Sequence, residues 1–184
     1  MIRLNKKILF IGRTGTGKTT IAYELAKVTG KKIVVVDDSF HPFYQEQGFK
    51  QVTLSYLDTW ESGNIVVIGD PTETLIYLNK HCSNAVVICE DAAKYIDASV
   101  KRDLKAFIID HRKRNFDCFI MFHFLAEVPP FLCRHYDSMV LFKTGDNLEE
   151  KLKKFANWHI ILERGLKVNA HPSYNYKLTI RKDE

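Results

Sequence analysis

The chain has 184 residues, of which 46% are hydrophobic and 27% charged, and its formal net charge at pH 7 is +5. This length and composition suit one α/β core, so we expect a single domain over residues 1–184. There is no signal-like segment before the first apolar run and no apolar stretch of membrane-spanning length, which argues against a membrane protein and predicts a soluble, cytoplasmic one. The positive charge is compatible with a polyanionic partner but does not by itself indicate one.

The cysteines argue against a disulfide-stapled or zinc-binding protein. Four are present, widely spaced and without a CxxC pair: Cys82, Cys89, Cys118 and Cys133. Two of them lie inside apolar runs that resemble strands. We therefore predict buried, reduced thiols.

The first predicted elements are a buried strand, a glycine-rich loop and a helix. Residues 7–11 (KILFI) form the apolar run, and a helix with an apolar stripe begins near Lys18. Between them residues 12–19 (GRTGTGKT) match the phosphate-binding pattern GxxxxGK[ST] in the order the pattern requires. Backbone N–H groups of such a loop and the helix N-terminus would face phosphate oxygens. Lys18 would reach the β- and γ-phosphates of ATP, and the Thr19 hydroxyl would bind Mg²⁺. The expected nucleotide contacts are Gly12, Arg13, Thr14, Gly15, Thr16, Gly17, Lys18, Thr19 and Thr20.

Apolar runs alternate with helical patterns along the rest of the chain. Strands are predicted at residues 32–36, 64–68, 85–89, 116–122 and 136–142, with a short edge strand near 51–56. Helices are predicted at residues 71–81 after an Asp70 cap, at 98–114, at 146–155 with Asp146 as cap, and at 158–168, before a short strand pattern in 174–181. The alternation predicts an α/β fold with a mostly parallel central sheet flanked by helices. Its core would cover about residues 5–145, and residues 146–184 would form a helical and strand extension.

Two adjacent carboxylates follow the predicted strand at 85–89. Glu90 and Asp91 would reach the same sheet edge as the glycine-rich loop, because ligands bind at the carboxyl ends of parallel strands. This resembles a Walker B element. We assign Glu90 to Mg²⁺, together with Thr19, and Asp91 to the attacking water, although the usual order is Asp then Glu. The alternative is a solvated helix cap.

The whole arrangement resembles the FtsK/HerA-type superfamily of P-loop ATPases, especially the genome-packaging ATPases of viruses and the ATPase domain of zonular occludens toxin-like phage proteins. The resemblance covers residues 5–145 and rests on residues 12–19, on Glu90-Asp91, and on residues 111–123 (HRKRNFDCFIMFH) continuing into 127–132 (EVPPFL). It implies a RecA/FtsK-like fold. It also implies that Arg112 or Arg114 acts in trans on a neighbour's nucleotide and that His123 senses the γ-phosphate.

Each of these roles has a structural alternative. A basic run such as residues 112–114 is also typical of a solvated helix end, and His123 suits a hydrogen-bonded core position. The family commonly has glutamine where this chain has His123, so the step would depend on pH in a way that glutamine would not allow. Asp37 and Asp38 end another strand, where they would contact water or nucleotide or form a turn. The aromatic residues 40–44 would stack on a base or cover the core.

Three functions follow from these patterns. The first is an ATP-hydrolysing motor that translocates DNA, most plausibly for viral or phage genome packaging. It would form a homo-oligomeric ring of five or six subunits, contact the DNA backbone and work with capsid or portal proteins in the host cytoplasm or in association with the virion. The second is a small-molecule or nucleoside kinase, although residues 143–154 lack the arginines of a lid. The third is a nucleotide-binding phage assembly or export factor.

Contacts to DNA would involve the phosphate backbone, since a translocase needs contacts that repeat along the strand. The candidate lysines and arginines form two clusters: Lys101, Arg102 and Lys105, and Lys151, Lys153 and Lys154.

Overall fold

A computed structural model describes residues 5–97, 102–146 and 152–183 of the chain. Over these residues eight strands form one sheet in the order β3-β4-β2-β5-β6-β1-β7-β8. The pairings from β3 to β7 are parallel, and only β7 and β8 run antiparallel. The strands are β1 (Lys7–Ile11), β2 (Lys32–Asp37), β3 (Lys50–Val52), β4 (Ile65–Ile68), β5 (Ala85–Cys89), β6 (Asp117–Phe122), β7 (Ser138–Leu141) and β8 (Leu178–Arg181).

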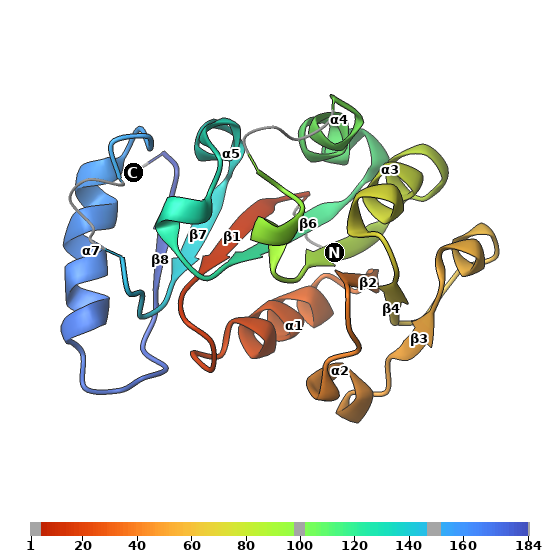
Figure 1. Ribbon diagram of the computed structural model, residues 1–184, viewed down its shortest axis with the longest axis horizontal. Coiled ribbons are helices and arrows are strands. Elements are labelled where there is room, and N and C mark those ends of the chain that lie inside the picture. Colours follow the sequence, from red (N-terminus) through yellow and green to blue (C-terminus); the bar gives the residue numbers. More distant parts are fainter. Residues whose placement is uncertain (1–4, 98–101, 147–151, 184) are drawn as a thin grey trace.

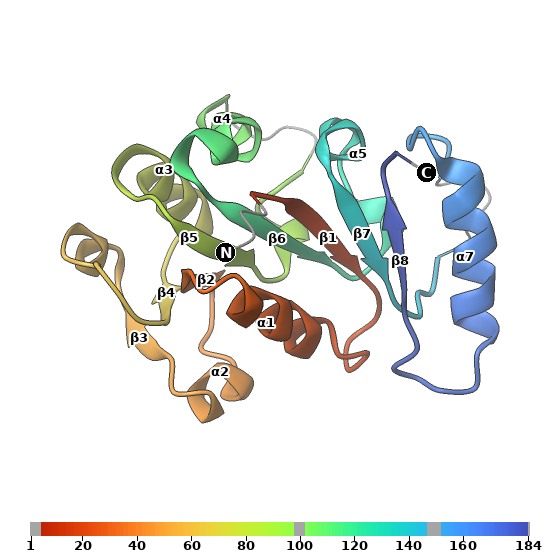
Figure 2. The same ribbon diagram turned by 180° about the vertical axis from the view of Figure 1, so that it is seen from behind.

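Helices cover both faces of this sheet (Figures 1 and 2). They are α1 (Lys18–Val28), α2 (Pro42–Glu46), α3 (Pro71–His81), α4 (Arg102–Asp110), α5 (Pro130–His135) and α7 (Trp158–Ala170). Short 3₁₀ helices lie at Leu54–Asp58, Ala92–Lys94, His111–Arg114 and Leu125–Glu127. The predicted α/β architecture is therefore confirmed.

The central strands are apolar on both faces, because each face has its own helical layer. On one face Phe10 and Met121 pack with Ala22 and Ala26 of α1 and with Tyr44 of α2. On the other face the alternate strand residues, such as Leu9 and Ile120, pack with α3, α4, α5 and α7. This two-layer burial explains why the strands appear in the sequence as continuous apolar runs rather than alternating ones.

All the parallel strands have their carboxyl ends on the same side of the sheet, which we call the carboxyl edge. β1 leads there into the glycine-rich loop, β2 ends in Asp37, β5 leads into Glu90, and β6 leads into His123. The backbone N–H of Glu90 donates to the carbonyl of Val36 over 3.2 Å, so the ends of β2 and β5 lie side by side. The amino ends of the same strands form the opposite edge, where β8 ends because it runs antiparallel.

Several predicted boundaries were wrong. The helix expected to reach residue 114 ends at Asp110, because the chain tightens into a 3₁₀ helix around the buried His111, whose ring contacts the carbonyls of Ile108 and Asn5. The predicted edge strand near 51–56 is only the three-residue β3 followed by a 3₁₀ helix. Of the strand pattern predicted in 174–181, only residues 178–181 form a strand, β8, which pairs with β7.

The starts of some predicted helices cannot be placed. Residues 98–101, expected to open one helix, and residues 147–151, expected to follow an Asp146 cap, lie outside the described part of the chain. Residues 152–155, predicted as the end of the second of these helices, form bends and turns instead. Asp146 itself accepts hydrogen bonds from the backbone N–H groups of Leu125 and Ala126. Other predictions agree with the structure: Asp70 caps α3 through the N–H groups of Thr72 and Glu73, and the predicted helix at 158–168 is α7.

All four cysteines are free and buried, as predicted. Among the described helices none has both the length and the apolar character needed to cross a membrane.

Candidate nucleotide-binding site

The loop after β1 has the strained geometry that its glycines allow. Gly15 and Gly17 have φ angles of 78° and 90°, in the left-handed region that residues with a Cβ rarely adopt. A Cβ on Gly12 would lie 2.5 Å from Cβ of Phe142, so only glycine fits where the loop leaves the sheet. Gly17 precedes α1 without a side-chain cap, and the first N–H groups of this helix therefore remain suited to an anion.

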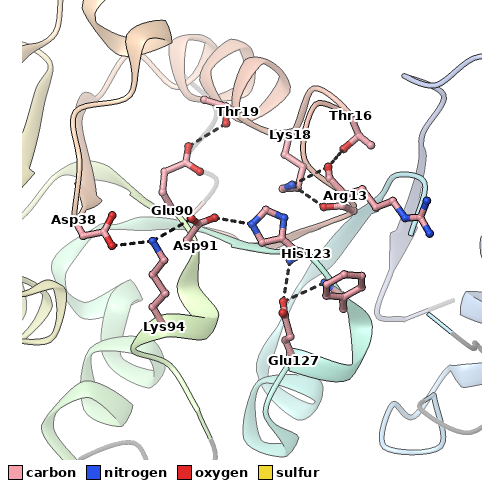
Figure 3. A network of polar contacts seen from close by, with 12 residues as sticks. Arg13, Thr16, Lys18, Thr19, Asp38, Glu90, Asp91, Lys94, His123 and Glu127 are labelled. Atoms are coloured by element: carbon pink, nitrogen blue, oxygen red, sulfur yellow. Dashed lines mark hydrogen bonds and ion pairs between the residues drawn. The ribbon is translucent and has the colours of Figure 1, made fainter. Parts of the chain in front are cut away.

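The side chains of the loop brace it from within. The Thr16 hydroxyl donates to the carbonyl of Arg13 over 2.8 Å. The Lys18 ammonium group donates to the carbonyls of Gly12, over 2.6 Å, and Arg13, over 3.1 Å (Figure 3). The Arg13 guanidinium points away from His123, and lies so close to Gly145 that a Cβ there would be 2.5 Å from it. Tyr174 of the extension donates to the carbonyl of Thr14 over 3.0 Å.

Glu90 meets the start of α1. The Thr19 hydroxyl donates to Glu90 Oε1 over 3.1 Å, and the buried Tyr44 hydroxyl donates to the same oxygen over 2.5 Å. Burial raises the pKa of the Glu90 carboxyl from 4.5 to about 7, against the two hydrogen bonds that favour the charged form. On the neighbouring strand, burial also raises the pKa of Asp37 to about 6. The site thus holds two carboxyl groups whose charge lacks a full compensating partner.

A hydroxyl and a carboxylate at this position fit Mg²⁺, which prefers oxygen ligands and is usually held by one or two protein groups together with phosphates. Thr19 and Glu90 are the described residues that offer this pair, and a divalent cation would favour the ionised form of the buried Glu90. The predicted metal ligands are therefore chemically suited to the ion.

Asp91 is the centre of a charged chain across the sheet edge (Figure 3). His123 Nε2 lies 2.8 Å from Asp91 Oδ1, while the Lys94 ammonium lies 3.3 Å from Oδ2 of the same carboxylate and 2.7 Å from Asp38. Asp91 has a positive φ of 43°, which aspartate tolerates better than most residues. Both of its oxygens are therefore oriented by neighbouring side chains.

The turn after β6 positions His123 for its contact with Asp91. Glu127 accepts hydrogen bonds from the backbone N–H groups of His123, over 3.0 Å, and Phe124, over 3.1 Å. The same carboxylate thus closes the turn that aims the imidazole at Asp91.

These groups line a cavity of about 370 Å³. Its walls come from the glycine-rich loop and the start of α1, from the ends of β2, β5 and β6, and from α2 with the segment before it: Thr14, Gly15, Gly17, Lys18, Thr19, Thr20, Asp37, Ser39, His41, Phe43, Glu90, Asp91 and His123. The structure therefore brings together most of the predicted site residues.

Arg112 and Arg114 are not among them. They precede β6, at the sheet edge opposite the glycine-rich loop. Arg112 forms an ion pair of 2.6 Å with Asp137, and Arg114 donates to the carbonyl of Lys80 over 2.9 Å. Neither can act on the site of its own subunit, and a role in trans stays a prediction.

The fold of this chain is similar to that of known proteins. No protein-family model matches the chain, and no curated protein does. Among solved structures, the genome packaging NTPase B204 from Sulfolobus turreted icosahedral virus 2, in complex with ATP-gammaS, aligns with a TM-score of 0.74 at 16% identity, over 97% of this chain and 92% of that one. B204 from Sulfolobus turreted icosahedral virus, the DNA-packaging ATPase, gives a TM-score of 0.73 at 17% identity over 99% and 95% of the two chains. This chain has a P-loop NTPase fold.

The N-terminal domain of zonular occludens toxin from Neisseria meningitidis also aligns, over 76% of this chain and 78% of that domain at 14% identity, but its TM-score of 0.47 is too low to support an argument. The likeness to B204, by contrast, spans nearly the full length of both chains and includes the extension with α7 and β8.

Sequence reasoning missed two contributors to the P-loop site. Tyr44 was considered only as a stacking or core residue, yet its hydroxyl contacts Glu90. Lys94, in the turn after the acid pair, had no motif to indicate it. The sequence signal for Tyr44 is limited to a polar hydroxyl on an aromatic residue, six residues after Asp38 at the end of the predicted strand.

Proposed function

We propose that this protein is an ATP-hydrolysing motor that moves DNA, in viral or phage genome packaging. The observation that carries the proposal is the convergence of Lys18, Thr19 and the Glu90-Asp91 pair on one cavity. The fold likeness to packaging NTPases over nearly the whole of both chains supports the choice of process. One of those structures holds ATP-gammaS, which favours a nucleoside triphosphate as the ligand.

Residues of the chain have distinct parts in the proposed reaction. Lys18, now bonded to carbonyls of its own loop, would turn its ammonium group to the β- and γ-phosphates. Thr19 and Glu90 would hold Mg²⁺, which supplies charge neutralisation at the phosphates. The N-terminus of α1 would bind the same negative charge without a proton transfer.

Asp91 would orient and polarise the attacking water. His123 fixes one carboxylate oxygen and Lys94 the other, so that the carboxylate cannot rotate freely. His123 would exchange this hydrogen bond for one to the γ-phosphate, which would make it the group that reports whether ATP or ADP is bound.

The motor would be a homo-oligomeric ring in which Arg112 or Arg114 approaches the phosphates of the neighbouring subunit. Their exposed place at the edge opposite the P-loop suits such a contact: Arg112 has a side chain that is 61% exposed. Capsid or portal proteins would be the further partners, and the host cytoplasm or the virion the place of action.

Displacement of a third strand from duplex DNA tests the proposal, because a translocating motor removes a triplex-forming strand only while it hydrolyses ATP. We expect displacement by the wild type with ATP and none by Asp91→Asn. ATP hydrolysis without any strand displacement would contradict the motor, and phosphate transfer to an added nucleoside would indicate the kinase instead.

A further inference from the structure

The sheet edge opposite the P-loop carries a second cavity, of about 540 Å³. It forms where β1, β6 and β7 begin and β8 ends, so it exists only because the antiparallel β8 brings the C-terminal segment to this edge. Its lining contains five lysine and arginine side chains and two aspartates: Lys6, Lys7, Arg112, Arg134 and Lys182, with Asp137 and Asp183. We call it the amino-edge cavity.

The positive charges of this cavity exceed its negative ones. Asp137 is already engaged, since it accepts from the Arg112 guanidinium over 2.6 Å and from the backbone N–H of Lys7 over 2.7 Å. His135, which also lines the cavity, has its pKa lowered by burial and by the nearby Lys7, Lys182 and Arg134. A positive local field of this kind attracts anions.

Two of the lysines are fixed in place by backbone carbonyls at the end of α5. The Lys7 ammonium is almost fully buried and donates to the carbonyl of His135 over 2.6 Å, while Lys182 donates to the carbonyl of Arg134. An ammonium group has three donors, so each lysine keeps donors for a ligand. Hydrogen bonds to the backbone thus hold these two ammonium groups in defined positions.

We propose that the amino-edge cavity binds phosphate groups of a nucleic-acid backbone, and so gives the motor its grip on DNA. This rests on the proposed function for the identity of the polyanion. Clustered lysine and arginine side chains without a base-reading element suit sequence-independent backbone contacts. Within one subunit, nucleotide and DNA would occupy opposite edges of the sheet. Arg112 is also a candidate for the contact to a neighbour's nucleotide, so the proposed DNA contacts rest on the other cations of the cavity: Lys6, Lys7, Arg134 and Lys182.

The same strands connect the two sites. β1 has Lys7 at one end and leads into the P-loop at the other, and β6 begins five residues after Arg112 and leads into His123. β7 begins after Asp137, and the chain beyond it accepts a hydrogen bond at the Lys143 carbonyl from the N–H of Arg13. A force applied by DNA bound in the cavity would therefore act on the same strands that position the P-loop and His123.

The test is the salt dependence of binding to a short fluorescently labelled DNA duplex, followed by anisotropy without nucleotide. Charge reversal in Arg134→Glu/Lys182→Glu should weaken binding at least about ten-fold and lower the slope of log affinity against log salt by about two. The matched control is Lys27→Glu/Lys167→Glu, which changes the net charge equally on α1 and α7 outside the cavity and should cost less than about three-fold. The neutral pair Arg134→Gln/Lys182→Gln should give an intermediate loss, and replaces the reversal pair if that fails to fold.

Each outcome decides a different part of the account. Equal weakening by the cavity and control pairs, or no weakening by either, would overturn the proposal. Loss of concentration-dependent ATP hydrolysis with unchanged DNA affinity would also overturn it, and would assign the cavity to the neighbour's nucleotide. Cavity-dependent DNA binding by a wild type that hydrolyses no ATP would refute the proposed motor while the DNA site stands.

Discussion

Lys18 lines the cavity that we propose as the nucleotide site. Its ammonium group satisfies the loop carbonyls of Gly12 and Arg13 and is the one P-loop cation that lines the cavity among the described residues. Lys18→Ala should weaken ATP binding at least about 100-fold and reduce hydrolysis to background, because the charge facing the phosphates is lost. Titration with a fluorescent ATP analogue measures the first effect and phosphate release the second. Lys27→Ala on the same helix is the control, and equal affinity in both variants would contradict the assignment.

Substitution of Asp91 should slow ATP hydrolysis without weakening ATP binding. In Asp91→Asn the side chain keeps its size and one hydrogen-bonding oxygen for His123 or Lys94, but it polarises water poorly. We expect ATP affinity within about three-fold of the wild type and a turnover number lower by about 10² or more. Equilibrium binding and single-turnover hydrolysis check this prediction. A variant with a normal turnover number would show that Asp91 has only a structural role, through its contacts with His123 and Lys94.

The pKa of Glu90 makes a prediction about stability. Both folded and unfolded chains hold the proton below pH 4.5, but the unfolded chain loses it first as the pH rises, because the folded pKa is about 7. The free energy of unfolding should therefore fall between about pH 4.5 and pH 7 through this group. Without nucleotide and in EDTA, Glu90→Gln should be more stable than the wild type at pH 8 by about 3 kcal/mol, and equally stable near pH 4.5.

Urea unfolding at both pH values measures the difference. The amide oxygen of Gln can still accept from Tyr44, so the comparison isolates the charge. A wild type and variant whose unfolding free energies run parallel across this range would show that Glu90 ionises normally.

At the scale of elements, one buried ion pair joins three strand starts at the amino edge. Lys31, before β2, donates to Asp117 of β6 over 2.7 Å, and the Asp117 carboxylate also accepts from the N–H of Lys6 before β1. The side chains of Lys31 and Asp117 are only 6% and 0% exposed. Lys31→Met would leave a buried carboxylate without its cation and should lower the free energy of unfolding by about 3 kcal/mol.

Lys27→Met removes an exposed ion pair with Glu24 on α1, and should change stability by less than about 1 kcal/mol. Denaturant unfolding of both variants gives the comparison. Similar small losses in both would mean that water replaces the missing cation at Asp117.

Elements whose signals are local could be predicted from the sequence, and those set by distant partners could not. Asp70 and Pro71 start α3 through hydrogen bonds within one turn, and the apolar runs of the central strands follow from burial on both faces. The pairing of β8 with β7 depends on how α7 packs, about forty residues after β7 began, and no local pattern encodes it. For the same reason the P-loop, the acid pair and His123 could be placed at one edge from strand order, whereas the contact of Tyr44 with Glu90 depends on the path of the chain after β2.

In the molecule as a whole, the two proposed functions lie at opposite edges of the sheet. The carboxyl edge carries the proposed nucleotide site, while the amino edge carries the amino-edge cavity and Arg112. A ring would bring the exposed Arg112 or Arg114 of one subunit to the nucleotide of the next. Residues of neighbouring subunits would then complete each other's active sites.

Mixed rings test this completion. Arg112→Ala and Asp91→Asn should each be inactive alone, but a mixed ring contains some sites with an intact Asp91 beside an intact Arg112. Equal mixing should restore about one quarter of the wild-type rate of ATP hydrolysis. The same mixture with Arg114→Ala distinguishes the two arginines. Full activity of both arginine variants by themselves would remove the role in trans.

The central claim is that the protein is an assembling, DNA-dependent ATPase. The most direct measurement is steady-state ATP hydrolysis across protein concentration, with and without double-stranded DNA, with Lys18→Ala as the blank. We expect the rate per subunit to rise with protein concentration and to rise further with DNA. A rate that stays flat across concentration, ignores DNA and lies near the blank would contradict it.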